Sequence, residues 1–240
     1  MRKEVTESVR ERIMVIDNRV KELKSANVAG DDGEVLTLKK EFRDIREEYD
    51  LFDKVFMENG KAGVVDIFGN VVVPALYKDF PELYNYTIYG RLPIPACDFN
   101  DKYALVASDG EGAPVCAFEY DMIKFKFGSS ALFQCWKRVG DKYLIGVIDC
   151  GGNVVVPCEM DEVYGMSNNY AVVEKEGKLG AVTTGGLYIE PAYDEFEERD
   201  GLLAACVDGV WGYISSKGEF IDMDDEERMD GEVLLCLFEH

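Results

Sequence analysis

The spacing of hydrophobic and polar positions changes once along the chain, near residue 54. Before that point, apolar residues recur at steps of three and four and form two stripes. The stripes comprise Val5, Val9, Ile13, Ile16, Val20 and Leu23, and then Leu38, Phe42, Ile45, Tyr49 and Phe52. This spacing predicts an amphipathic helix over about Lys3–Ala26 and a second one after the turn-rich segment Asn27–Glu34. Asp31 or Asp32 is the expected cap of the second helix, and the pair predicts a helical hairpin.

From residue 55 onward, one phrase recurs five times: a hydrophobic strand, a turn that ends in glycine, and another hydrophobic strand. The copies are Lys61–Pro74, Ile145–Pro157, Lys178–Pro191, Val210–Ile221 and a weaker Leu105–Ala117. Their turn glycines, 43, 40, 34 and 32 residues apart, are Gly69, Gly112, Gly152, Gly186 and Gly218. Self-similarity at a nearly fixed period predicts small stacked units that share a core. The helical hairpin is expected to cap the open end of this stack, with oligomerisation or partner docking as its alternative role.

Each turn has a local chemical signature. Three residues before its glycine stands a side chain that accepts hydrogen bonds: Asp66, Asp109, Asp149, Thr183 or Ser215. A type I turn favours such a residue at its first position and glycine at its fourth, so each copy is predicted to be a β-hairpin. Four copies have a glycine six positions earlier, at Gly63, Gly146, Gly180 and Gly212. A glycine inside a strand predicts a β-bulge or a close backbone approach.

A further hydrophobic strand precedes the hairpins, as at Ala171–Glu174 and Ala204–Val207. The predicted fold is therefore mainly β, with tandem antiparallel three-stranded β-meander units behind an N-terminal α-helical hairpin. The predicted domains are residues 1–54 for the helices and 55–240 for the repeats, which end in a trailing strand over residues 232–238. The period leaves open whether the units form an open curved sheet or a closed ring.

Taken together, these offsets resemble those of WG-repeat proteins, a largely bacterial group of β-rich repeats. The best matches are Lys178–Asp194 and Val210–Ile221, and the second contains the pair Trp211-Gly212. The trailing Tyr-Asp position of the family pattern is carried by Tyr120-Asp121, Met160-Asp161 and Tyr193-Asp194. Tryptophan stands in only one copy, and apolar residues replace it elsewhere. The resemblance implies a protein-interaction or surface module and brings no catalytic residues with it.

Composition narrows the possible partners. The net charge of −21 comes from 47 acidic and 26 basic residues, which disfavours binding to nucleic acid or to an anionic membrane. No signal peptide is visible, unless one was removed, and no segment is long enough to span a membrane. The seven cysteines are odd in number and widely spread, which favours free thiols in a cytoplasmic protein. A disulfide between Cys150 and Cys158 is the alternative.

The sequence offers few groups for catalysis. The single histidine is His240, the last residue, which excludes histidine-based triads and metal clusters. Asp121, Asp161 and Asp194 recur at one position of the repeat, and recurrence favours a structural role at a turn. We therefore predict a protein without catalytic residues, cofactor or metal. A carbohydrate-binding or acid-pair hydrolytic module is the alternative, since carboxylates are abundant.

Two insertions distinguish this chain from a regular repeat. The segment Tyr77–Pro95 is rich in tyrosine, and the segment near Phe125–Lys142 combines tryptophan with basic residues on an acidic chain. Aromatic side chains and arginine are enriched at interfaces. The candidate interaction residues are therefore Tyr84, Tyr86, Tyr89, Trp136, Lys137 and Arg138. The hypothesis is a scaffold for protein–protein interaction with an unknown partner; contact of the acidic segment Glu219–Glu232 with a basic partner is a further possibility.

Overall fold

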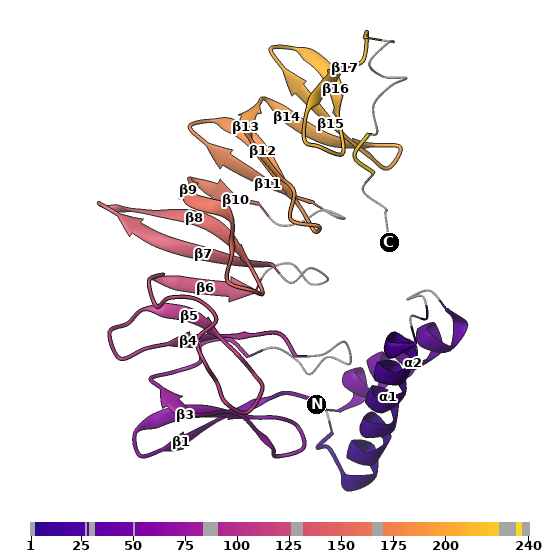
Figure 1. Ribbon diagram of the computed structural model, residues 1–240, viewed down its shortest axis with the longest axis vertical. Coiled ribbons are helices and arrows are strands. Elements are labelled where there is room, and N and C mark those ends of the chain that lie inside the picture. The colour runs from indigo at the N-terminus through magenta and orange to yellow at the C-terminus, as the bar shows by residue number, and fades with distance from the viewer. Residues whose placement is uncertain are drawn as a thin grey trace. The chain divides into compact units, whose positions relative to one another are not determined.

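The computed structural model describes residues 3–26, 28, 32–49, 51–83, 91–125, 132–164, 170–225 and 234–236, with Phe125 described by its backbone alone. Within these residues the chain is mainly β, with two helices at its N-terminal end, as predicted (Figure 1). The chain forms two compact units. The first comprises Met1–Asp101 with Leu105–Val115, and the second comprises Lys102–Ala104 with Cys116–His240.

The predicted helical hairpin is present as α1 (Glu7–Ser25) and α2 (Gly33–Glu48). Asp32 caps α2, because its carboxylate accepts a hydrogen bond from the amide of Glu34 at 2.8 Å. Asp31, the other predicted cap, lies outside the described residues. Two arginines of α1 form two-pronged ion pairs with glutamates of α2: Arg12 with Glu41 at 2.5 and 2.7 Å, and Arg19 with Glu34 at 2.6 and 3.1 Å. These pairs are solvent-exposed, so they orient the helices more than they stabilise them.

The apolar stripes of the helices make the core of the first unit. Ile13 and Ile16 of α1 are fully buried, and they pack with Phe42 of α2, with Leu51 and with Ile67. Ile67 lies in the turn of the first hairpin, directly after Asp66. The helical hairpin therefore covers that turn within the first unit.

The strands between α2 and residue 106 form two sheets. β1 (Lys54–Glu58), β2 (Lys61–Val65) and β3 (Val71–Tyr77) form the predicted antiparallel meander. β4 (Ile94–Cys97) and β5 (Tyr103–Val106) form a two-stranded sheet. The weak repeat copy starts in β5, and its second arm is bound by two backbone hydrogen bonds of 2.8 Å instead of a full strand, Ala107 N to Ala113 O and Val115 N to Leu105 O. This copy lacks the in-strand glycine, and Val106 stands at that position.

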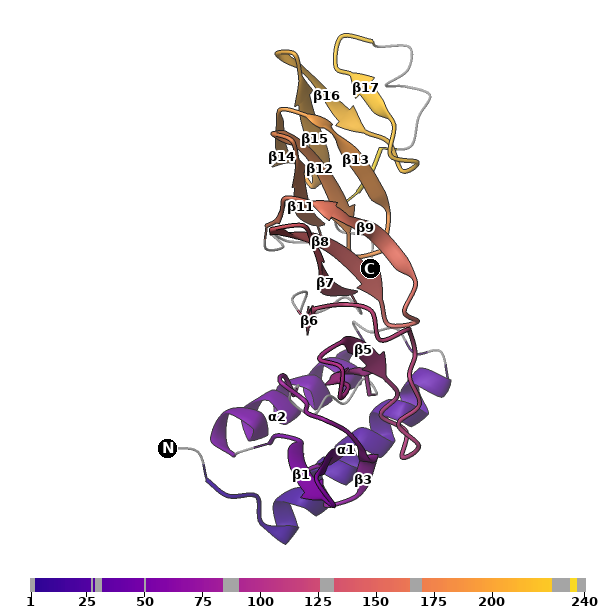
Figure 2. The same ribbon diagram turned by 90° about the vertical axis from the view of Figure 1, so that its left-hand side faces the viewer.

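The second unit contains three antiparallel four-stranded sheets in succession (Figures 1 and 2). The first has β6 (Met122–Phe125), β7 (Leu132–Val139), β8 (Lys142–Asp149) and β9 (Val154–Met160). The second has β10 (Glu162–Val163), β11 (Tyr170–Lys175), β12 (Lys178–Thr183) and β13 (Tyr188–Tyr193). The third has β14 (Glu195–Arg199), β15 (Leu202–Val207), β16 (Val210–Ile214) and β17 (Phe220–Asp222).

Each of these sheets contains the predicted three-stranded meander and one more strand. The additional strands β6, β10 and β14 follow the last strand of the preceding repeat copy and pair with the first strand of the next meander. A sheet therefore begins one strand earlier than the sequence repeat. In the described part of the chain every sheet is open, and none closes into a ring.

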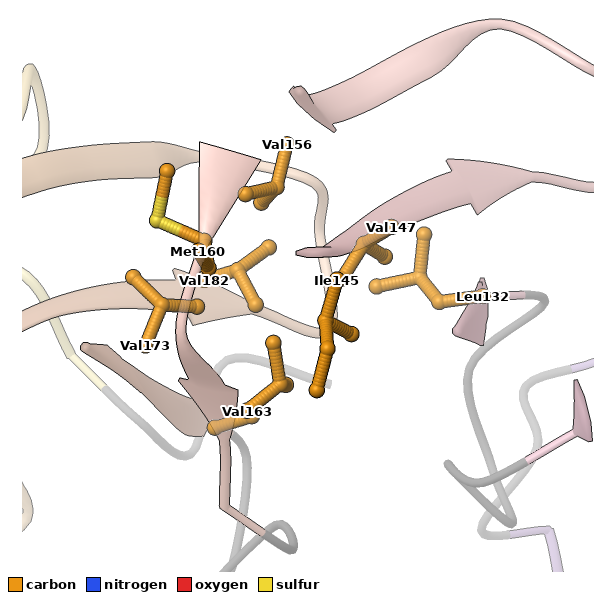
Figure 3. Packing of buried hydrophobic residues seen from close by; sticks show 9 residues of the cluster. Leu132, Ile145, Val147, Val156, Met160, Val163, Val173 and Val182 are labelled. Carbon is orange, nitrogen blue, oxygen red and sulfur yellow. The ribbon is translucent and has the colours of Figure 1, made fainter. Parts of the chain in front are cut away.

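Neighbouring sheets of the second unit share hydrophobic cores. Ile145, Val147 and Met160 of the first sheet pack with Val173 and Val182 of the second (Figure 3). The same second sheet packs through its other residues with the third, where Leu203, Ala205 and Ile214 are fully buried. A single repeat of a stacked array does not bury its hydrophobic face alone, so this sharing stabilises each repeat through its neighbours.

The end of the chain covers the last of these sheets. Of the predicted trailing strand, the described residues are Leu234–Cys236. The amide of Leu235 donates to the carbonyl oxygen of Ile214 at 2.8 Å, and the Leu235 side chain packs on the shared core. These residues cap the third sheet.

The five turns have the predicted chemistry. In each turn, the amide of the glycine donates to an oxygen of the residue at the start of the turn, which is the backbone carbonyl in four turns and the Asp109 carboxylate in the other. The five glycines have positive φ values of 70° to 87°. Asp149, for example, accepts from the amides of Gly151 and Asn153, both at 2.8 Å. Thr183 and Ser215 do the same with their hydroxyl oxygens. The side chain satisfies amides that the hairpin leaves free, and glycine tolerates the left-handed backbone that follows.

The in-strand glycines face a β-bulge. At Gly63, Gly146 and Gly180 the pairing register shifts, so that three residues of the next strand stand opposite the single glycine. Each of these bulges contains one of the repeated prolines, Pro74, Pro157 or Pro191. Proline has no amide hydrogen to donate to the neighbouring strand, so within a sheet it is tolerated in a bulge. The copy at Gly212 has no proline at that position, and its pairing with β17 shows no shift.

Replacement of Gly180 by alanine is expected to destabilise the protein by about 1–3 kcal/mol. A Cβ at this position would lie closer than 3.0 Å to the backbone carbonyl of Ile189, and backbone cannot move aside as a flexible side chain can. Gly185→Ala is the matched control in the same hairpin, because its Cβ would meet only Thr183 Oγ1, at 3.7 Å. Thermal or urea unfolding measures both. Equal melting temperatures for the two variants would refute the role given to the in-strand glycine.

Candidate functional site

Three of the six candidate interaction residues lie on one strand. Trp136, Lys137 and Arg138 belong to β7, so the second predicted insertion supplies a regular strand of the repeat over residues 132–139. Trp136 is half-buried, lies between Met122 and Ile145 of the neighbouring strands, and packs against the shared core. Tyr84, Tyr86 and Tyr89, the candidates from the first insertion, lie outside the described residues.

The tip of the β7–β8 hairpin is the exposed part of this region. We call Arg138, Val139, Lys142 and Tyr143 the β7–β8 tip. Val139 is 57% exposed and Tyr143 is 55% exposed, and in the pairing register they stand opposite Lys142 and Arg138. The Arg138 Nε donates to the carbonyl oxygen of Gly140 at 3.1 Å, which fixes the guanidinium at the turn. The tip thus combines two exposed apolar side chains with two cationic ones.

Lys137, next to the tip, is held by two contacts. Its ammonium lies 2.7 Å from Glu119 Oε2 and 4.8 Å from the centre of the Tyr120 ring. A cation over a tyrosine face and beside a carboxylate is well satisfied inside the molecule. Lys137 therefore orders the region below the tip rather than offering a free charge.

The repeated aspartates connect consecutive repeats. Asp121, Asp161 and Asp194 each use one carboxylate oxygen to accept the amide of a residue at the next meander's first turn, at 2.7, 2.9 and 2.8 Å. Those amides belong to Arg138, Glu176 and Asp208. The other oxygen faces a lysine of the aspartate's own repeat: Lys102 at 2.6 Å, Lys142 at 3.9 Å and Lys178 at 2.5 Å. We call each of these arrangements an aspartate latch.

The electrostatics of the latches support the structural interpretation. The hydrogen bond from Lys178 and that from the amide of Asp208 lower the pKa of Asp194 below its ordinary value, and Lys102 together with the Arg138 amide lowers the pKa of Asp121. An acid catalyst needs the opposite, a carboxyl with a raised pKa that keeps its proton near neutrality. These two carboxylates are held in their charged form as acceptors.

The single tryptophan of the family pattern also packs internally. The guanidinium of Arg199 lies 4.1 Å from the centre of the Trp211 ring, in the third sheet of the second unit. Such stacking covers one face of the ring. Trp211 is half-buried and pairs with Cys206 of β15.

A buried ion pair in the first unit was not anticipated from the sequence. Arg91 lies 2.7 Å from Asp53 and 3.3 Å from Asp66, and both carboxylates are largely shielded from solvent. Burial raises the pKa of Asp53, while the hydrogen bond from Arg91 opposes that shift. Asp66 is also the first residue of the turn in the first hairpin. Arg91 therefore links that turn to Asp53, the residue directly before β1. The partners are far apart in the sequence, and no local pattern links them.

The seven cysteines are free thiols in the structure, and two of them lie in contact. The sulfur atoms of Cys135 and Cys158 lie 3.4 Å apart. Cys150, the partner considered for Cys158 in the disulfide alternative, is solvent-exposed.

No group of three or more histidine, cysteine or carboxylate side chains within the described residues is arranged to hold a metal ion. Neither α1 nor α2, the helices in the described part, is long and apolar enough to cross a membrane.

Comparison with known proteins supports the repeat interpretation. Residues 145–178 match the family model of the WG containing repeat, which confirms the resemblance seen in the repeat offsets. This segment runs from β8 through β11 to the first residue of β12. No curated protein sequence matches the chain. Among solved structures, one described as "Crystal structure of the eukaryotic initiation factor" is similar with a TM-score of 0.33 and 11% identity, over 71% of this chain and about half, 51%, of that chain.

Replacement of Asp194 by asparagine is expected to lower the melting temperature at neutral pH by about 1–2 °C, because an exposed latch loses its ion pair but keeps an acceptor for the Asp208 amide. The folded-state pKa of Asp194 lies below its unfolded value, so its contribution is present above about pH 4 and is lost as the pH falls through the folded value. The difference between wild type and variant should therefore disappear in acid.

Glu195→Gln is the matched control, since it removes the same charge from the next residue, which is exposed on β14. Thermal unfolding between about pH 3 and pH 8 separates the two variants. If Glu195→Gln reproduces the pH-dependent loss of Asp194→Asn, general charge repulsion and not the latch explains the effect.

Proposed function

We propose that this WG-repeat chain is a non-catalytic scaffold that binds a protein partner through the β7–β8 tip. The observation that carries the proposal is the pairing of exposed Val139 and Tyr143 with Arg138 and Lys142 at the end of two eight-residue strands. Tyrosine and arginine are enriched at protein interfaces, where they combine contact area with directed hydrogen bonds.

The rest of the second unit supports a rigid platform for this tip. Trp136 packs in the shared core, and Lys137 is fixed by Glu119 and the Tyr120 ring. The Asp121 latch binds the amide of Arg138 itself. Binding costs less conformational entropy when the contact residues are held before the partner arrives.

The charge of the tip indicates the chemistry of the partner. The chain carries a net charge of −21, so a local pair of cations stands out from its surroundings. Asp141 lies in the turn between Arg138 and Lys142, so these three charged residues carry a net charge of +1 (two cations and one carboxylate). An acidic surface with an apolar centre fits the two cations and the exposed Val139 and Tyr143, while a strongly basic partner fits the rest of the chain. We therefore expect the partner to present a carboxylate beside an apolar side chain.

The alternative of an acid-pair hydrolytic or carbohydrate-binding module draws less support. The three recurring carboxylates are acceptors in latches, and two of them have lowered pKa values. Their recurrence therefore has a structural explanation.

The proposal is tested by placing a photo-crosslinking residue at Tyr143 in the source cells. Covalent adducts with one protein are expected, and Arg138→Ala should strongly reduce them. The control position is Val154, which is 60% exposed on the same sheet but lies on β9, away from the tip. Equal labelling from both positions would contradict the assignment of the tip. Binding or turnover of a glycan that is lost on Asp121→Asn or Asp161→Asn would instead favour the alternative.

A further inference from the structure

Two thiols approach each other across a glycine in the first sheet of the second unit. Cys135 of β7 pairs directly with Gly146 of β8, and Cys158 of β9 belongs to the bulge on the other side of that glycine. A Cβ on residue 146 would lie 2.8 Å from the Cys158 sulfur. The missing side chain of Gly146 therefore leaves the space in which the two sulfur atoms stand 3.4 Å apart, although their strands are not neighbours.

The repeat does not require cysteine at these two positions. In the first meander, Phe56 faces the in-strand Gly63, and Ala75 lies in the bulge opposite it. In the repeat after the cysteine pair, Val173 faces Gly180, and Pro191 takes the central position of the bulge that Cys158 takes here. The fold accepts one larger and one small apolar side chain there, so a pair of thiols is a property of this repeat alone among these three.

The two thiols have different environments. Cys135 is fully buried, and its hydrogen bond with Cys158 and its burial raise its pKa above the ordinary value. Cys158 is half-buried; the hydrogen bond from Cys135 and the nearby ammonium of Lys137 lower its pKa, while burial and Glu119 act in the opposite direction. A thiolate is the reactive form of cysteine. The less buried cysteine of the pair is thus also the one whose thiolate forms more readily, and the fully buried Cys135 beside it is the better proton donor.

We propose that Cys158 and Cys135 form a reversible oxidation site, in which Cys158 reacts with a peroxide and Cys135 resolves the product to a disulfide. The inference is independent of the proposed partner surface. In the first step the Cys158 thiolate attacks one oxygen of hydrogen peroxide; an S–O bond forms, the O–O bond breaks, and hydroxide leaves and is protonated to water. Cys158 is then a sulfenic acid.

In the second step the Cys135 sulfur attacks the Cys158 sulfur. The S–S bond forms, the S–O bond breaks, and the hydroxide that leaves takes the Cys135 proton as water. Two sulfurs lose one electron each, and one peroxide becomes two waters. The sulfur atoms must close from 3.4 Å to a bond of about 2.05 Å. Cys158 lies in a bulge, where three residues stand opposite one and the ladder is locally open, so that segment is the part of β9 that moves.

The test is oxidation of the purified, folded chain with a small excess of hydrogen peroxide, followed by thiol alkylation and peptide mapping. The expected product has lost two of its seven thiols, contains a peptide pair linked through Cys135 and Cys158, and recovers both thiols with dithiothreitol. Overoxidation of Cys158 without a disulfide, a disulfide to any other cysteine, or no reaction at either residue would each overturn the proposal.

Two single variants separate the roles. Cys135→Val should stop at the Cys158 sulfenic acid, which dimedone labels, and Cys158→Ala should leave Cys135 unreactive. Dimedone labelling of Cys158 that is no higher in Cys135→Val than in wild type would overturn the resolving role. The valine copies Val173 of the next repeat and the alanine copies Ala75 of the first meander, and circular dichroism verifies folding. Should a variant unfold, mapping of the wild-type disulfide still decides the proposal.

Discussion

The close approach of one strand's backbone to a glycine of the next strand organises this protein. Where Gly146 or Gly180 lies, the carbonyl of the neighbouring strand occupies the volume that a side chain would need. At these two glycines the hairpin also contains a bulge, in which three residues of one strand stand opposite a single residue of the other. Bulges increase the local twist of a hairpin. The core shared by the first two sheets of the second unit and the cysteine pair both lie at hairpins that contain this bulge.

The glycine and the proline of the repeat are two halves of this one feature. Along the sequence they stand eleven residues apart, as at Gly180 and Pro191, and they look like separate signals. In the fold they face each other across the bulge. The last copy supports the link between proline and bulge because it lacks both. Gly212 has no matching proline, and the pairing register of its strand continues without a shift. Composition and pairing thus change together from copy to copy.

Features formed by residues close together in the sequence could be predicted, and features formed by contacts between repeats could not. The turns at Asp149 and Ser215 were predictable, because a side chain, three amides and a glycine within five residues define them. The helices were predictable from their apolar stripes. The latches were only partly predictable. Recurrence indicated a structural role for Asp194, but the hydrogen bond that it accepts from the Asp208 amide depends on how the next repeat packs. The meeting of Cys135 and Cys158 could not be predicted, because it depends on the offset that the bulge introduces between strands that are not neighbours.

The offset between the sequence repeat and the sheet has a consequence for how such chains grow and shrink. β10 and β14 each follow the end of one copy but pair with the first strand of the next meander. A duplication or deletion of one whole period would give each such strand an equivalent partner from another copy, and every sheet would stay complete. Loss of only part of a period would instead separate Asp161 or Asp194 from the turn that it binds. We therefore expect such chains to differ in the number of whole repeats more than in the length of a single repeat.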